Sequence, residues 1–495
     1  MNGTSITPPA APPNQVYLGT FIYPQRHDAL AYLHNTAVYV CGATGKIVAV
    51  EPNADRTHGM DETFTRLGWS AAETRILDIT PHPVKFFFPG FVDTHIHASQ
   101  YPNAGIFGKS TLLDWLNTYT FPLEASLSRQ QADGIAKAKR IYTRCVRRTL
   151  AHGTTCAAYF ATRDVTTTNL LADICLVAGQ RALVGRVCMD EARTCPDWYR
   201  DESAEESVAA TEAVAAYITR ELDPEGHWVR PIVTPRFAPS CSKSAMVGLA
   251  QVAQRDGLFV QTHVSENQGE IELVRELFPH EFGGGSYVGV YDAFGLLHSR
   301  TILAHAVHLS EAEVRTVASR GAGVSHCPCS NSAITSGAAR VRWLLDRGVR
   351  VGLGTDMSGG YSPSVLEAAR QAILVSRHVA MGISDKDGPG RAEEKERAKL
   401  SVEEVLWLAT GGGASLVGLG ETMGRFEVGM EWDAQLVGLG GVDVLGEGAK
   451  GEDYGDVDVF GWESWEDVVA KWLYNGDDRN TKKVWIRGRL VHERQ

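Results

Sequence analysis

Short apolar runs alternate with amphipathic stretches along the middle of the chain. Segments such as 132–150, 202–222 and 362–379 carry apolar residues at helical spacing, whereas the runs between such segments suit buried strands. This alternation is typical of βα units that build a parallel sheet. The predicted strands cover residues 87–97, 154–161, 182–189, 229–237, 258–264, 301–307, 321–327 and 349–356.

The number of these repeats predicts the fold. Eight strand–helix repeats match a TIM (β/α)8 barrel, here distorted by insertions. Several of the runs are apolar throughout, as expected when helices cover both faces of a sheet. We therefore predict the α/β class, with the barrel formed by residues 85–423.

The two ends of the chain have a different pattern. Residues 16–84 and 424–495 contain short strand-like pieces, and neither end supplies enough strands for a stable sheet alone. We expect the two ends to form one small β-sandwich domain together. Residues 1–15 hold four prolines and few apolar side chains, which predicts a mobile tail. The charged stretch 384–401 lacks an apolar face and is interpreted as a solvated loop.

Charge and composition narrow the range of partners. A formal net charge of -11 gives no basic field for phosphates, so we expect no nucleic-acid partner. The chain has no apolar run of about 18 residues, so no membrane span is expected. Its start lacks a signal-peptide pattern, and its nine cysteines are odd in number and scattered, as expected for reduced thiols. These features predict a cytoplasmic protein.

Five side chains that can bind a metal lie at the ends of predicted strands. They are His95, His97, His263, His305 and Asp356. Residues two apart on a strand point to the same side, so His95 and His97 can face one ion. Each signal alone is weak, because a single histidine is more often structural and an Asp after Gly-Thr is often a helix cap. Together they predict a metal site at the rim where barrel enzymes carry their active sites.

Three further residues near this rim suit catalysis and binding. Glu266 lies three residues after His263, where a carboxylate can move protons, although it could also be an ordinary glutamate at a helix N-terminus. Arg236 and Phe237 end the fourth strand and offer a donor fork and a stacking face for a flat heterocycle. An ordinary ion pair and a core ring are the alternative for these two. The C-x-C pair of Cys327 and Cys329 has no partner pair, which favours structural thiols.

The chain contains the segments PGFVDTHIHASQY, VTPRFAPSCS, THVSEN, LAHAVHLS, SHCPCSNSAITSG and GLGTDMSGGYSPS. These motifs resemble those of the guanine deaminases of the amidohydrolase superfamily. The resemblance extends from about residue 85 to 495, and its most particular elements are HASQY, TPRF and FEVGMEWDA. In this superfamily a second metal needs a carbamylated lysine at the end of strand 4. Residues 229–237 contain no lysine, and Lys243 lies beyond them, so one metal is expected.

The resemblance implies a set of site residues. The metal ligands would be His95, His97, His263 and Asp356, which hold one Zn²⁺ per chain, with Fe²⁺ as the other ion that these ligands accept. The catalytic residues would be Glu266, His305 and Asp356, with His305 beside the ion. The residues that contact substrate would be His97, Gln100, Arg236, Phe237, His263, Glu266 and Asp356.

The implied activity is hydrolytic deamination of guanine to xanthine and ammonia in purine catabolism, by a homodimer. Two alternatives stay open from the sequence. The first is a related amidohydrolase deaminase that acts on another heterocycle, such as a triazine or an oxidised purine. The second is a non-catalytic scaffold with an amidohydrolase-like barrel, a class that typically loses its metal ligands, whereas this chain keeps them.

Overall fold

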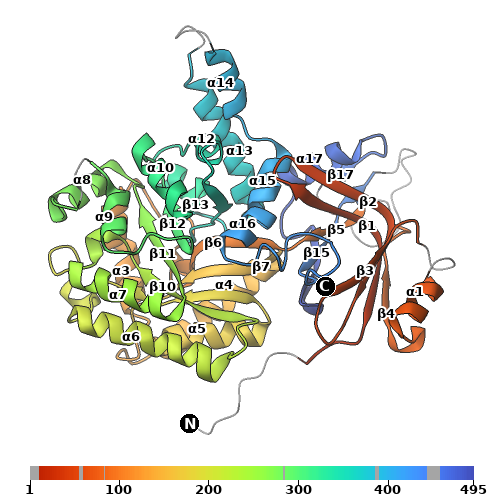
Figure 1. The fold of residues 1–495 in the computed structure, drawn as a ribbon, viewed down its shortest axis with the longest axis horizontal. Helices are drawn as coiled ribbons and strands as arrows, with labels where there is room; N and C mark the ends of the chain where they lie inside the picture. Colours follow the sequence, from red (N-terminus) through yellow and green to blue (C-terminus); the bar gives the residue numbers. More distant parts are fainter. Residues whose placement is uncertain are drawn as a thin grey trace.

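A computed structural model describes residues 10–54, 60–82, 84–281, 285–384, 390–442 and 457–494 (Figure 1). The described residues form two large sheets that lie side by side, one surrounded by helices and one built mainly from the chain ends. No helix among these ranges is long and apolar enough to span a membrane.

The larger sheet is the predicted barrel. Its principal strands pair in parallel and in chain order from β6 to β14, and the short strand β9 (Val187–Cys188) pairs beside β10. The principal strands are β6 (Phe91–His97), β7 (Thr154–Phe160), β8 (Arg181–Gly185), β10 (Val229–Pro235), β11 (Phe259–Val264), β12 (Thr301–His305), β13 (Gly323–His326) and β14 (Arg350–Leu353). Nearly all of their residues are buried, which explains why the runs are apolar throughout.

Hydrogen bonds beside the strand ends close the barrel between β6 and β14. Thr94 Oγ1 donates to Leu353 O at 2.9 Å, and the Asp356 N–H donates to His95 O at 2.8 Å. The His97 N–H donates to Met357 O at 3.0 Å. These bonds hold the ends of β6 and β14 together, and with them three of the predicted metal ligands.

Helices cover the barrel, and several of them begin at a capping side chain and end at a left-handed glycine. Asp164 caps α5 by accepting from the Thr167 N–H, and Gly179 ends that helix in the left-handed conformation. Ser242 and Gly257 do the same for the ends of α7. The longer covering helices are α4 (Gly134–Ala151), α5 (Val165–Ala178), α6 (Ala204–Ala216), α7 (Lys243–Asp256), α8 (Gln268–Leu277), α9 (Tyr287–Ala293), α10 (Glu311–Arg320), α13 (Val365–Met381) and α15 (Val402–Trp407).

The smaller sheet combines both ends of the chain, as predicted. Its order is β19-β18-β15-β5-β1-β2-β3, with β4 paired to β1. Trp432 stacks on Tyr17 at 4.2 Å within an aromatic cluster on one face, and α1 (Met60–Leu67) covers the other face. The strands are β1 (Gln15–Arg26), β2 (Ala29–Val40), β3 (Ile47–Glu51), β4 (Arg75–Asp78), β5 (Lys85–Pro89), β15 (Ala434–Gly438), β18 (Thr481–Ile486) and β19 (Arg489–Glu493). Helix α17 (Trp465–Asn475) places Trp472 against Phe88 at 4.9 Å.

Two element boundaries differ from the predictions. The apolar run 87–97 is two strands, because it breaks at Gly90, where a side chain would collide with Thr155. Its first part, β5, belongs to the small sheet. Of the predicted tail 1–15, residues 1–9 lie outside the described residues, whereas Gln15 already begins β1 and donates to Gly488 O at 2.7 Å.

The prediction of a loop for residues 384–401 is wrong in part. Residues 391–398 form the helix α14 (Arg391–Ala398), which projects from the barrel in Figure 1, and residues 385–389 lie outside the described residues. None of the helix residues is buried, which confirms that this segment has no apolar face. Charged pairs one turn apart, such as Arg391 with Glu394, support a helix without such a face.

Candidate active site

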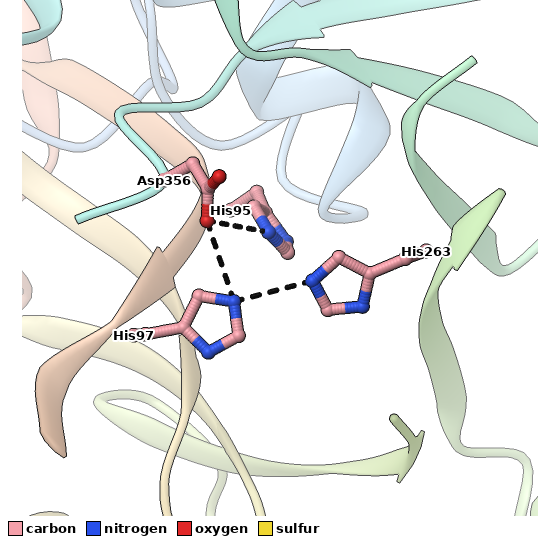
Figure 2. Close-up of side chains that lie close together, drawn as sticks. All are labelled: His95, His97, His263 and Asp356. Atoms are coloured by element: carbon pink, nitrogen blue, oxygen red, sulfur yellow. Dashed lines mark hydrogen bonds and ion pairs between the residues drawn. The ribbon is translucent and has the colours of Figure 1, made fainter. Parts of the chain in front are cut away.

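The structure brings the four predicted metal ligands together at the carboxyl ends of the barrel strands (Figure 2). His95 and His97 extend from the end of β6, His263 from β11, and Asp356 from the turn after β14. One atom from each of the four lies within 4.8 Å of the others. His95 Nε2 lies 3.1 Å from Asp356 Oδ1, and His97 Nε2 lies 3.4 Å from the same oxygen and 3.2 Å from His263 Nε2.

The charges and burial of these groups fit a cation. Burial lowers the pKa of His95, His97 and His263, so the three imidazoles are neutral and their ring nitrogens can coordinate. Burial raises the pKa of Asp356, but the neighbouring histidines outweigh it and hold the pKa below its usual range. Three neutral imidazoles and one carboxylate, converging on one point, form a donor set that suits a catalytic zinc.

Hydrogen bonds fix which nitrogen faces the cluster. His263 Nδ1 donates to Arg236 O at 2.5 Å, which leaves Nε2 for the cluster. His305 Nδ1 donates to Asn331 Oδ1 at 2.8 Å. Its Nε2 therefore points inward, 3.5 Å from Glu266 Oε2 and 3.8 Å from Asp356 Oδ2. His305 thus lies between the ligand cluster and the predicted proton carrier.

The Glu266 side chain faces the cluster and does not cap the helix that follows it. The side chain that caps α8 belongs to Asn267, whereas Glu266 Oε1 accepts from Ser336 Oγ at 2.9 Å. Burial raises the pKa of Glu266 to about 7, although the adjacent His305 opposes this shift. A carboxyl group with such a pKa can both accept and release a proton near neutral pH. Glu270 Oε2 accepts from the Glu266 N–H at 2.8 Å and holds its backbone.

A cavity opens over the cluster and takes in the predicted substrate contacts. The empty space above the cluster, including its opening to solvent, is about 410 Å³. The cavity is lined by His97, Gln100, Leu112, Trp115, Leu116, Arg236, Phe237, His263, Glu266, Glu270, His305, Ile334 and Asp356. All the residues predicted for substrate contact therefore line this one cavity. The remaining lining residues are mostly apolar.

The sequence reasoning missed Glu124, which lies behind this wall. It belongs to α3 (Phe121–Ala125), is fully buried, and forms an ion pair with Arg236 at 2.7 Å. Gln100 Nε2 also donates to Glu124, at 2.9 Å. No motif or strand-end rule marks Glu124, because it comes from a short helical segment far from both partners in sequence.

Asp93 was also missed, although a signal for it was present. It lies two residues before His95 on β6, and so on the same side of the strand. Its carboxyl group accepts from the Thr355 N–H at 3.0 Å and from Thr355 Oγ1 at 2.6 Å. Asp93 therefore fixes the turn that carries Asp356. The two-residue period that identified the histidines extends backwards to this residue.

Left-handed backbone conformations concentrate around the site. Ser265, His305, Ala306 and Asp356 are non-glycine residues with φ between 45° and 70°. Side chains disfavour this region, and it persists where surrounding contacts hold it. The turns after β11, β12 and β14 are thus held in costly conformations that aim side chains into the cavity.

Other candidate groups do not join the four-ligand cluster. Lys243 begins α7 and pairs with Glu281 at 2.7 Å near the surface, so it is not placed to bridge two metals. Cys327, His95 and His305 form a second group whose ligand atoms lie within 4.8 Å of one another. Burial raises the pKa of the Cys327 thiol, however, and so disfavours the thiolate that would bind a metal.

Comparison with known proteins identifies relatives of this chain. Residues 86–491 match the amidohydrolase family. The chain is 46% identical over 409 residues to the probable guanine deaminase of Schizosaccharomyces pombe, covering 83% of this chain and 72% of that protein. It is 39% identical over 476 residues to the guanine deaminase of Rattus norvegicus, covering 96% of each. A solved guanine deaminase from C. acetobutylicum with guanine in its active site has a TM-score of 0.79 and 29% identity, covering 97% of this chain and 100% of that one.

Proposed function

Because the chain belongs to the amidohydrolase family and within it to the guanine deaminases, we propose that it hydrolyses guanine to xanthine and ammonia. The observation that carries the proposal is the convergence of His95, His97, His263 and Asp356 below a cavity that contains Arg236. A scaffold would need neither the metal-binding group nor the cavity.

These four side chains would hold one Zn²⁺ or Fe²⁺ ion, since both ions accept imidazole and carboxylate ligands. When bound, the ion would lower the pKa of a water molecule toward 7 and so make it a nucleophile at neutral pH. His263 is held for this task by its bond to Arg236 O, and Asp356 by the turn that Asp93 fixes.

Glu266 transfers protons in this reaction, and Asp356 and His305 lie next to it. Glu266 accepts a proton from the attacking water and delivers it to the ring nitrogen next to C2 of guanine. The second proton of the same water passes from the added hydroxyl group through Asp356 to the amino group, which leaves as ammonia. His305 Nε2 lies between the two carboxylates and can donate to the oxygen that gains negative charge during attack.

The wall of the cavity would bind the purine. Arg236 offers donors to a carbonyl oxygen, and Phe237 and Trp115 offer apolar surface to the flat ring. Gln100 faces the same space. Guanine has a carbonyl oxygen and ring N–H groups along its edge, so it matches this arrangement.

The test is turnover of the purified protein with a panel of substrates and identification of each product. We expect guanine to give xanthine and ammonia, and about one zinc or iron per chain. Faster turnover of a triazine or an oxidised purine would favour the alternative heterocycle. Two tightly bound metals per chain would contradict the single-metal site.

The homodimer and the cytoplasmic location expected from the sequence stay predictions. Light scattering of the purified protein tests the first, and fractionation of cells tests the second.

A further inference from the structure

We infer that Glu124 is a positioning residue that sets the substrate preference of the cavity by fixing the orientation of the Gln100 carboxamide and of the Arg236 guanidinium. This inference rests on the proposed function, since it concerns the same cavity. It adds a residue that does not line the cavity and that acts through two residues that do.

The contacts of Glu124 divide evenly between its two oxygens. Oε1 accepts from Gln100 Nε2 at 2.9 Å and from Ser99 Oγ at 3.2 Å. Oε2 accepts from Arg236 Nη1 at 2.7 Å and from Tyr199 Oη at 2.9 Å. A fully buried carboxylate with four donors has no freedom to rotate, so it holds its partners firmly.

This arrangement determines which end of the Gln100 amide faces the substrate. A carboxylate only accepts hydrogen bonds, so the amide must turn its NH₂ group toward Glu124. The other end, Gln100 Oε1, is buried and has no hydrogen-bond partner among the described residues. An acceptor without a partner, on a side chain that lines the cavity, is placed to accept from an N–H group of the ligand.

Arg236 supplies the opposite group. Glu124 engages its Nη1, and the guanidinium also lines the cavity, where it can only donate. The cavity therefore presents a fixed donor together with a fixed acceptor. This pair matches a purine edge with a carbonyl oxygen beside a ring N–H, as in the 6-oxopurines. A 6-aminopurine carries the reverse pattern and would leave buried polar groups unpaired.

The experiment measures the affinity of hypoxanthine and of adenine by calorimetry, on the protein purified with its metal. Neither ligand carries the 2-amino group, so the readout does not depend on deamination of guanine. We expect the wild type to prefer hypoxanthine. Glu124→Gln lets the new amide donate to Gln100 Oε1 and so permits the Gln100 amide to turn. The preference should then fall by about tenfold or more.

Two further variants sharpen the test. Glu313→Gln changes a buried glutamate that caps α10 away from the cavity, and it should keep the wild-type preference. The exchange Gln100→Glu/Glu124→Gln restores a donor–acceptor pair between the two positions and leaves an acceptor facing the cavity. It should retain the preference for hypoxanthine even if Glu124→Gln alone does not fold.

The outcomes separate the two hypotheses. A wild type that binds adenine as tightly as hypoxanthine overturns the role of Glu124, and so does a Glu124→Gln protein with an unchanged preference. Loss of the preference in the exchange variant also contradicts it. If the wild type prefers hypoxanthine and Glu124→Gln loses that preference, but guanine releases no ammonia, the proposed reaction is rejected and the role of Glu124 is supported.

Discussion

Two buried arginines at opposite ends of the barrel have different surroundings. Arg181 begins β8 and donates to Asp433 from Nε at 2.6 Å and from Nη2 at 2.9 Å. It also pairs with Glu431 and donates to His227 O at 3.0 Å. Its partner carboxylates precede β15, so the contact joins the barrel to the small sheet. Every side of this guanidinium meets a protein acceptor.

Arg236, which follows β10, has protein partners for only part of its guanidinium group. Among the described residues its carboxylate partner is Glu124, and the guanidinium lies over the Phe121 ring, at 5.0 Å from its centre, and lines the cavity. In barrel enzymes the amino ends of the strands serve stability and the carboxyl ends carry function. The hydrogen bonds of the two arginines show this difference. All three nitrogens of Arg181 donate to protein acceptors, whereas a bound ligand would complete the hydrogen bonds of Arg236.

The largest effect on the functional end is expected for Glu266→Gln. The amide keeps the size and the bond to Ser336 but cannot carry a proton, so turnover of guanine should fall by about 10²–10⁴-fold. Metal content and thermal stability should stay near those of the wild type. A variant within threefold of wild-type activity, by ammonia release, would remove Glu266 from the reaction.

The comparison itself is tested by exchanging each arginine for methionine. Arg181→Met leaves Asp433 buried without its main partner, and it should lower the free energy of unfolding by about 3–5 kcal/mol. The catalytic efficiency of the folded fraction should change little. Urea unfolding and ammonia release measure the two properties.

Arg236→Met should show the opposite pattern. It should lower kcat/KM for guanine by about 10- to 100-fold, the cost of a lost hydrogen bond to a buried acceptor, while metal content is retained. Its effect on unfolding should be the smaller of the two, because Glu124 keeps three other donors. Equal losses of stability in both variants would show that the two ends of the barrel do not differ in this way.

His305 and His263 allow a finer comparison within the functional end. Four other side chains already form a group that could hold the metal, and His305 Nε2 lies 3.8 Å from Asp356 Oδ2. We expect His305→Ala to keep most of its metal and to lose about 100-fold in activity, as for loss of an oriented donor. His263→Ala should lose both, as measured by metal analysis and turnover. A metal-free His305→Ala protein would make His305 a ligand.

The site histidines could be predicted from the sequence because, in a barrel, a residue's place along its strand determines where the residue lies in space. A histidine at the carboxyl end of any barrel strand must lie at one rim, so His95, His263 and His305 could be grouped without coordinates. Glu124 could not, because its place depends on how an irregular segment packs over that rim. Helix α14 escaped prediction for a related reason, since charged pairs and not an apolar stripe support it.

The smallest effect is expected for Ser336→Ala, which changes the proton affinity of Glu266 and not its place. Burial raises the pKa of Glu266, and the hydrogen bond from Ser336 lowers it. Without that bond the carboxylate is less stable, so its pKa should rise further. The reaction needs Glu266 ionised, so activity is lost as the pH falls through this pKa. The acid limb of the kcat/KM profile for guanine should therefore move to higher pH, by about one unit or less.

Ser332→Ala, at an exposed position in the same segment, is the matched control and should leave the profile unchanged. An acid limb that stays in place, or moves to lower pH, would show that another group controls it.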